Sequence, residues 1–112
     1  MTEENLPTKS VGRGFAQLAG IIEEARSYSE AARAENTQRA YRSDWEHFVT
    51  WCDSRRLAPL PAKPGTVAAY LTDHAGRLKA STLGRRLAAI RAAHAYAGKP
   101  VDLGYQALRA AF

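Results

Sequence analysis

The clearest pattern in the chain is a stripe of apolar residues that recur every three or four positions, as on one face of an α-helix. The strongest stripe consists of Tyr41, Trp45, Phe48 and Cys52. It predicts a helix that begins behind the N-cap candidates Asn36 and Thr37 and ends near Arg55. A weaker stripe predicts an earlier helix over residues 15–33, and its members are Phe15, Leu18, Ile22 and Ala25.

A proline-rich segment then interrupts the helical pattern. Residues 57–65 read LAPLPAKPG and predict a loop. Pro64 suits the first turn of the next helix, because that position needs no backbone N–H. The third stripe predicts a helix over residues 64–78, and its members are Val67, Tyr70, Leu71, His74 and Leu78.

A fourth helix is predicted from the cap candidates Ser81 or Thr82 to Gly98, which is followed by Pro100. Its apolar face carries Leu83, Leu87, Ile90 and His94, and its opposite face carries Ser81, Arg85, Ala89 and Ala92. A short last helix begins near Gly104 and includes Tyr105, Leu108 and Phe112. No strand pattern occurs, so we expect an all-α domain over residues 15–112 behind a flexible tail over residues 1–14.

The charge of the chain is uneven. Residues 74–112 carry seven basic side chains and one acidic side chain, Asp102, whereas the whole chain has a net charge of +5. A basic segment of this kind indicates a polyanionic partner such as a nucleic acid, although a solvated basic face gives the same pattern.

The remaining composition bears on the compartment. A single cysteine, Cys52, excludes an internal disulfide and a thiolate zinc site. The polar N-terminus is no signal peptide. No apolar run reaches the roughly 18 residues that a membrane span requires. We therefore expect a cytoplasmic protein that has no membrane partner and no small-molecule substrate.

Several motifs together resemble one known domain. Thr37 is followed four residues later by Tyr41, then by the pair Asp44–Trp45, and then by Phe48 and Trp51. This pattern resembles the helix that opens the central part of core-binding domains in tyrosine recombinases of the phage integrase class. Residues 64–71 and 81–94 resemble the third and fourth helices of that domain. The resemblance covers about residues 15–112 and is closest to the Cre-like and Xer-like members.

The resemblance implies an orthogonal bundle of four to five helices, a SAM-like core-binding domain that forms half of a clamp around double-stranded DNA. Its second and fourth helices would face the major groove and its phosphates through Thr37, Arg39, Arg42, Ser81, Arg85 and Arg86. Thr37 would lie at a helix N-terminus, where backbone N–H groups favour a phosphate. Leu108 and Phe112 would contact a neighbouring recombinase protomer. The catalytic domain would follow residue 112, so we expect no catalysis here.

The residues themselves agree with part of this reading. Arg85 lies opposite the apolar stripe of its helix, so periodicity predicts an exposed side chain that can reach phosphate or guanine. Arg42 and Arg86 have an alternative role in salt bridges to Asp44, Glu46 or Asp73. Arg91 is expected to flank the core. Small residues near Arg85 suit a close approach to a groove, although helix propensity also explains them; these are Ala88, Ala89 and Ala92.

Other candidate chemistry has structural explanations. The spacing of His74 and Arg77 occurs among catalytic residues of tyrosine recombinases, but here it falls in the part that resembles the non-catalytic domain. We read His74 as a helix-face residue and Arg77 as a partner of the helix C-terminus. His94 lies on an apolar stripe and is expected to be a core histidine. We therefore predict no metal site and no cofactor. Trp51 is the one aromatic residue that we expect to be partly exposed.

Two further readings remain open at this stage. The chain could be a protein-interaction bundle that assembles recombinase protomers without significant DNA affinity, because the segment from Leu108 to Phe112 looks like an exposed apolar tail. It could also be a helix-turn-helix regulator. The loop at residues 57–65 is too long and too rich in proline for the tight turn of that motif.

Overall fold

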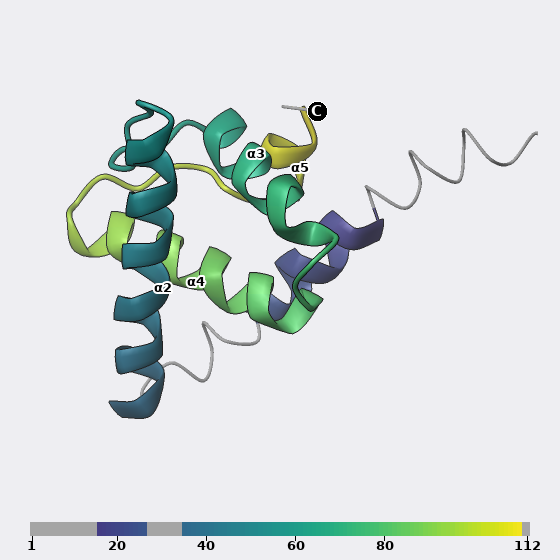
Figure 1. Ribbon diagram of the computed structural model, residues 1–112, viewed down its shortest axis with the longest axis horizontal. Helices are drawn as coiled ribbons and strands as arrows, with labels where there is room; N and C mark the ends of the chain where they lie inside the picture. Colours follow the sequence, from purple (N-terminus) through teal and green to yellow (C-terminus); the bar gives the residue numbers. More distant parts are fainter. Residues whose placement is uncertain (1–15, 27–34, 111–112) are drawn as a thin grey trace, which may run out of the picture.

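The computed structural model describes residues 16–26 and 35–110, and every regular element within these ranges is an α-helix. A helical segment over residues 16–26 is followed by four helices: α2 (Glu35–Ser54), α3 (Pro64–Ala75), α4 (Ala80–Tyr96) and α5 (Tyr105–Ala110). Figure 1 shows α2 crossing α4, with α5 beside α3 and the segment 16–26 near the start of α4. The predicted all-α fold is confirmed. The expected tail over residues 1–14 lies outside the described residues.

Two helices begin earlier than their expected caps. α2 begins at Glu35, so Asn36 and Thr37 lie in its first turn and neither is its N-cap. α4 begins at Ala80 behind Lys79, whose backbone is extended and whose side chain makes no capping bond. Ser81 and Thr82 therefore lie inside α4, and the prediction that one of them caps it was wrong.

The third helix ends earlier than expected. It begins at Pro64 as predicted but stops at Ala75, because the backbone N–H groups of Arg77 and Leu78 both donate to the carbonyl of His74 over 3.0 Å. These bonds close a tight turn that leads directly into α4. The predicted helix over residues 15–33 is described only over residues 16–26.

The apolar stripes meet in one core between the helices. Phe48 and Cys52 from α2 and Tyr70 from α3 are fully buried, while Tyr41 and Trp45 are partly buried against them. The core also takes in residues from every other element, namely Leu18, Ile21, Ile22, Val67, Leu71, Leu83, Leu87, Ile90, Leu103 and Leu108. The predicted stripes on α2, α3 and α4 are confirmed.

Two of the small residues on α4 do not form an open surface. Ala88 and Ala89 are each 2% exposed, whereas Ala92 is exposed. α4 lies in the middle of the bundle, between α2 and the segment 16–26, so its nominal polar face is partly covered. Of the two explanations for these alanines, close approach to a groove is therefore wrong for Ala88 and Ala89.

Leu108 is buried as well. Its side chain is 0% exposed, because α5 folds back against α3. The expectation of an exposed apolar tail was wrong at this residue, since Leu108 belongs to the core of its own chain. Phe112, the other residue of that tail, lies outside the described residues.

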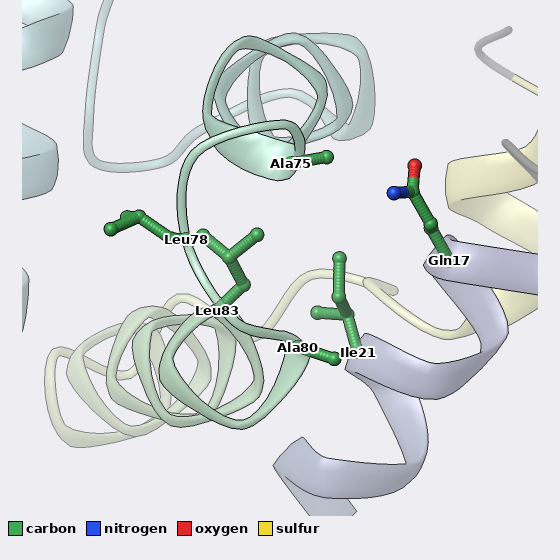
Figure 2. Close-up of a pocket in the computed structure, with 6 residues that line it drawn as sticks. All are labelled: Gln17, Ile21, Ala75, Leu78, Ala80 and Leu83. Atoms are coloured by element: carbon green, nitrogen blue, oxygen red, sulfur yellow. The ribbon is translucent and has the colours of Figure 1, made fainter.

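Gly84 lets the N-terminal segment approach α4 closely. A Cβ atom at Gly84 would lie 2.2 Å from Cβ of Glu24 and 2.9 Å from the backbone oxygen of Ile21. Real Cβ atoms do not come so near, so this crossing requires glycine. Beside it is a small open hollow of about 80 Å³, far below the roughly 300–1,000 Å³ of typical ligand sites. Figure 2 shows its lining, which consists of Gln17, Ile21, Ala75, Leu78, Ala80 and Leu83.

Two helices end in the same hydrogen-bond pattern. At the end of α4, Gly98 has a φ of 70°, and the N–H of Lys99 donates to the carbonyl of His94 over 2.9 Å. At the end of α2, Arg56 has a φ of 58°, and the N–H of Leu57 donates to the carbonyl of Cys52 over 2.9 Å. Both are left-handed C-terminal caps. The predicted role of Gly98 is confirmed. Arg56 adopts the same left-handed backbone conformation although it is not a glycine.

Two polar side chains tie loops to α4. His94 is 1% exposed and bonds the backbone N–H of Ala62, in the proline-rich loop, over 2.9 Å. Arg91 donates to the carbonyl of Leu103 over 3.0 Å, just before α5. The predictions that His94 is a core histidine and that Arg91 flanks the core are confirmed.

Candidate nucleic-acid interface

The crossing of α2 and α4 is held by a buried carboxylate. Asp44 on α2 is 3% exposed and accepts two bonds from Arg85 on α4: one from Nε over 2.6 Å and one from Nη2 over 3.1 Å. The Arg85 side chain is 32% exposed. Periodicity predicted an exposed arginine, but α2 covers part of that face of α4, so Arg85 is only partly exposed. Arg85 thus reaches the surface while its hydrogen bonds to the buried Asp44 hold it in place.

The neighbouring Arg86 lies deeper. Its side chain is 15% exposed, and its Nε lies 3.7 Å from Oδ1 of Asp44. Its Nη1 donates to the hydroxyl of Tyr70 over 3.2 Å and to Nδ1 of His47 over 3.1 Å. The alternative prediction for Arg86, a salt bridge with Asp44, is confirmed. Arg86 therefore links three helices, with little of its side chain at the surface.

His47 lies among hydrogen-bonding groups from two other helices. Its Nδ1 lies 2.8 Å from the hydroxyl of Tyr70 and 3.1 Å from Nη1 of Arg86, which also lies 3.5 Å from its Nε2. Partial desolvation lowers the pKa of His47, and the positive charge of Arg86 lowers it further. Burial also raises the pKa of Tyr70 to about 12, so the Tyr70 hydroxyl keeps its proton at neutral pH.

His74 joins this group through its ring. The rings of His47 and His74 lie 5.4 Å apart, and Nδ1 of His74 bonds the carbonyl of Tyr70 over 2.8 Å. The sequence gives no sign of this pairing, since the two histidines are on different helices. Within residues 16–26 and 35–110, no three side chains of the ligand-forming types come together as a metal site would require.

A second charged group joins the ends of α2 and α3. Nε1 of Trp51 donates to Asp73 over 2.9 Å, and Arg55 bonds the same carboxylate over 3.3 Å while stacking 4.3 Å from the Trp51 ring. Trp51 is 8% exposed, so the expectation that it is partly exposed was wrong. The Trp51 hydrogen bond lowers the pKa of Asp73. Arg77 donates to the carbonyl of Asp73 over 2.9 Å, which confirms its role at the C-terminus of α3.

The other expected DNA contacts lie in the N-terminal halves of α2 and α4. Arg39 and Arg42 on α2 and Ser81 on α4 are exposed. Ser81 precedes Arg85 by one helical turn, so both lie on the same side of α4. Thr37 is in the first turn of α2, but its side chain lies outside the described residues. The arrangement therefore brings Ser81 and Arg85 together on α4, and Arg39 and Arg42 together on α2.

Comparisons with known proteins give a consistent result. The family described as "Phage integrase, N-terminal SAM-like domain" matches residues 26–99. The chain is 42% identical over 69 residues to an "Integrase/recombinase xerD homolog" of Selenomonas ruminantium. That match covers 62% of this chain and 20% of the relative, so the chain spans only a small part of that protein. No solved structure matches the chain significantly. No described helix is long and apolar enough to cross a membrane.

Proposed function

The chain belongs to the N-terminal SAM-like domain family of phage integrases, which are tyrosine recombinases, and we propose that it grips double-stranded DNA at a recombination site through α2 and α4. The observation that carries this proposal is the crossing of these two helices, where Asp44 holds Arg85 at the surface. Arg39, Arg42 and Ser81 are exposed on the same two helices.

Each of these residues has a distinct proposed role. Arg39 and Arg42 neutralise phosphates, which supplies affinity independent of sequence. Ser81 and Arg85 contact base edges and phosphates in the major groove. The first turn of α2, which contains Thr37, directs its backbone N–H groups at a phosphate. Arg86 supports the interface from within, because its side chain is 15% exposed and bonds α2 and α3.

We propose that these residues contribute binding and no cleavage. The pair His74 and Arg77 has the spacing of a catalytic motif, but both side chains bond backbone carbonyls of α3. This engagement supports a structural role for the pair. The cleavage of DNA is expected to require residues of a catalytic domain. A supercoiled plasmid incubated with this chain should therefore stay intact, and nicked product would contradict the assignment.

Salt-dependent binding tests the proposal. We expect the chain to bind a short mixed-sequence duplex with a Kd of roughly 10⁻⁴–10⁻⁶ M at moderate salt, and the affinity to fall steeply as salt rises. Arg39→Ala should weaken binding and reduce the slope of log K against log salt by about 0.9. Lys99→Ala is the matched control, because it removes the same charge beyond the far end of α4, and the helix from Ser81 to Tyr96 is roughly 22 Å long.

The results of these experiments distinguish DNA binding from protomer assembly. Binding that does not respond to salt, or equal effects of Arg39→Ala and Lys99→Ala, contradicts an interface on α2 and α4. The alternative of a protomer-assembly module remains a proposal, now resting on Phe112 alone, since Leu108 is buried. It predicts self-association that depends on protein concentration and not on salt, which sedimentation velocity measures directly.

A further inference from the structure

His47 lies where α2, α3 and α4 meet. It is an exposed residue of α2, and Figure 1 shows α3 and the first half of α4 on the same side of that helix. Its Nδ1 lies 2.8 Å from the hydroxyl of Tyr70 on α3 and 3.1 Å from Nη1 of Arg86 on α4. These contacts hold one nitrogen of an otherwise exposed imidazole ring.

The second nitrogen of this ring has no acceptor beside it. In the part of the chain that the structure describes, the one hydrogen-bonding contact of Nε2 is with Nη1 of Arg86 over 3.5 Å, and an arginine can only donate. A protonated imidazole has an N–H on both nitrogens, so the N–H at Nε2 needs an acceptor that these residues do not supply. Because Arg86 brings a positive charge to the same atom, the acceptor that fits this place is an anion.

The charged groups around His47 disfavour its proton in the absence of such an anion. Partial desolvation lowers its pKa, and Arg86 from α4 and His74 from α3 lower it further. Asp44 from α2 raises the pKa, but this carboxylate is 3% exposed and already paired with α4. Tyr70 from α3 has a pKa of about 12 and stays neutral. An anion from outside would therefore restore the proton that the surroundings remove.

His47 also lies on the side of α2 that carries a proposed phosphate contact. It follows Arg39 by eight residues, which places it roughly 12 Å along the helix and within a quarter of a turn of the same face. DNA presents one phosphate about every 3.4 Å of its axis on each strand. A strand that runs along α2 from Arg39 therefore brings further phosphates to His47.

We propose that protonated His47 binds a DNA phosphate through Nε2, so that the domain takes up a proton from the solvent when it binds DNA. This inference rests on the proposed DNA-binding function. Arg86 supports the site with its charge, whereas Arg39 and Arg42 bind phosphates without any change of protonation. The bound phosphate raises the pKa of His47, so the affinity for DNA rises as pH falls through the range between the free and bound values.

Proton uptake tests the proposal directly. Titration calorimetry of the chain with a short mixed-sequence duplex at pH 7, in two buffers with different heats of ionisation, gives the number of protons taken up. We expect net uptake, and an affinity at fixed sodium chloride that rises by up to about tenfold per pH unit for each proton between pH 8 and pH 6. His47→Gln should abolish the uptake and flatten this dependence. NMR titration of the wild-type ring should show a higher pKa with the duplex than without it, and this measurement needs no variant.

The matched control is His74→Gln, which replaces the neighbouring histidine. His74 is on α3, and its Nδ1 bonds the carbonyl of Tyr70, so this variant should keep the uptake. Arg42→Gln should weaken binding at every pH and also keep the uptake. Salt-dependent binding without proton uptake overturns the inference, as does uptake that survives His47→Gln or is lost in His74→Gln. A wild-type chain that binds no duplex in a salt-dependent way refutes the proposed function itself.

Discussion

The backbone N–H of Ala62 donates to Nε2 of His94 over 2.9 Å, and this bond fixes the state of the imidazole. Nε2 must offer a lone pair, so the ring proton is on Nδ1, which donates to the carbonyl of Ile90 over 2.8 Å. Both bonds are buried. The proline-rich loop is therefore attached to α4 through one neutral histidine.

Replacing that histidine should destabilise the fold. His94→Leu leaves the buried N–H of Ala62 without an acceptor, which costs about 1–3 kcal/mol. The midpoint of urea unfolding should fall accordingly. Tyr96→Leu is a control on the same helix, because Tyr96 is 95% exposed, and its midpoint should stay within error of wild type. Equal midpoints for His94→Leu and wild type would show that the bond contributes nothing.

Gly84→Ala should loosen the N-terminal segment. The new Cβ would lie 2.9 Å from backbone atoms of Ile21 and Ala25, which cannot move aside as a flexible side chain can. We expect a loss of roughly 1–3 kcal/mol in the free energy of unfolding and faster amide exchange in residues 16–26. Gly65→Ala, in open space in the first turn of α3, is the control and should not destabilise. Unchanged exchange in Gly84→Ala would contradict the close crossing.

Arg56→Gly should stabilise the chain. Arg56 has a φ of 58°, a left-handed conformation that is unfavourable for residues with a side chain. Glycine accepts it freely, so we expect a gain of about 0.5–1 kcal/mol and a higher Tm. The opposite change at the equivalent site, Gly98→Ala, should lower Tm, because Gly98 has a φ of 70°. Movement of both Tm values in the same direction contradicts this account.

The chain should become less stable in mild acid because His47 is protonated more readily in the unfolded state. Partial desolvation, followed by the charges of Arg86 and His74, lowers the pKa of His47 from its usual value of 6.5. The unfolded chain therefore binds the proton more readily than the folded chain. The contribution of His47 is complete above pH 6.5 and declines as pH falls through the lowered pKa. Urea midpoints between pH 8 and pH 5 measure this decline, and His47→Gln should flatten it. If the urea midpoint of His47→Gln falls as much as that of the wild type, other titrating groups cause the loss of stability.

Cys52 should react only when the chain opens. Its side chain is 0% exposed, and burial raises the pKa of the thiol to about 11. Because the thiolate is the reactive form, a thiol reagent at pH 8 should label the folded chain far more slowly than the urea-unfolded chain. Gly84→Ala, if it loosens the bundle, should accelerate labelling. Comparable rates in the folded and unfolded wild-type chain contradict the burial of Cys52.

Local signals in the sequence predicted the helices well. The stripe through Phe48 and Cys52, the helix start at Pro64 and the end at Gly98 depend on residues close together in the chain, and all three were confirmed. Helix starts near Asn36 and Ser81 were misplaced by a residue or two, because a cap-type side chain does not by itself fix the first turn.

The site was less accessible to sequence analysis. Asp44 and Arg85 are 41 residues apart, and they pair because α2 crosses α4, which helical periodicity does not encode. The same holds for His47 and His74, which meet between α2 and α3. Leu108 looked exposed because its burial depends on α5 folding back onto α3. Periodicity assigns each residue to a face of its own helix, and packing decides which faces meet.

The close crossing at Gly84 has a consequence for where this domain can be cut. Family comparison recognises residues 26–99, yet Leu18, Ile21 and Ile22 before that stretch and Leu108 after it complete the core. A chain trimmed to the recognised stretch would lack the residues that pack against α4 at Gly84. The apolar side chains that these residues cover would then be exposed to water, and we expect such a chain to aggregate. The stretch that matches the family is thus shorter than the stretch whose side chains build the core.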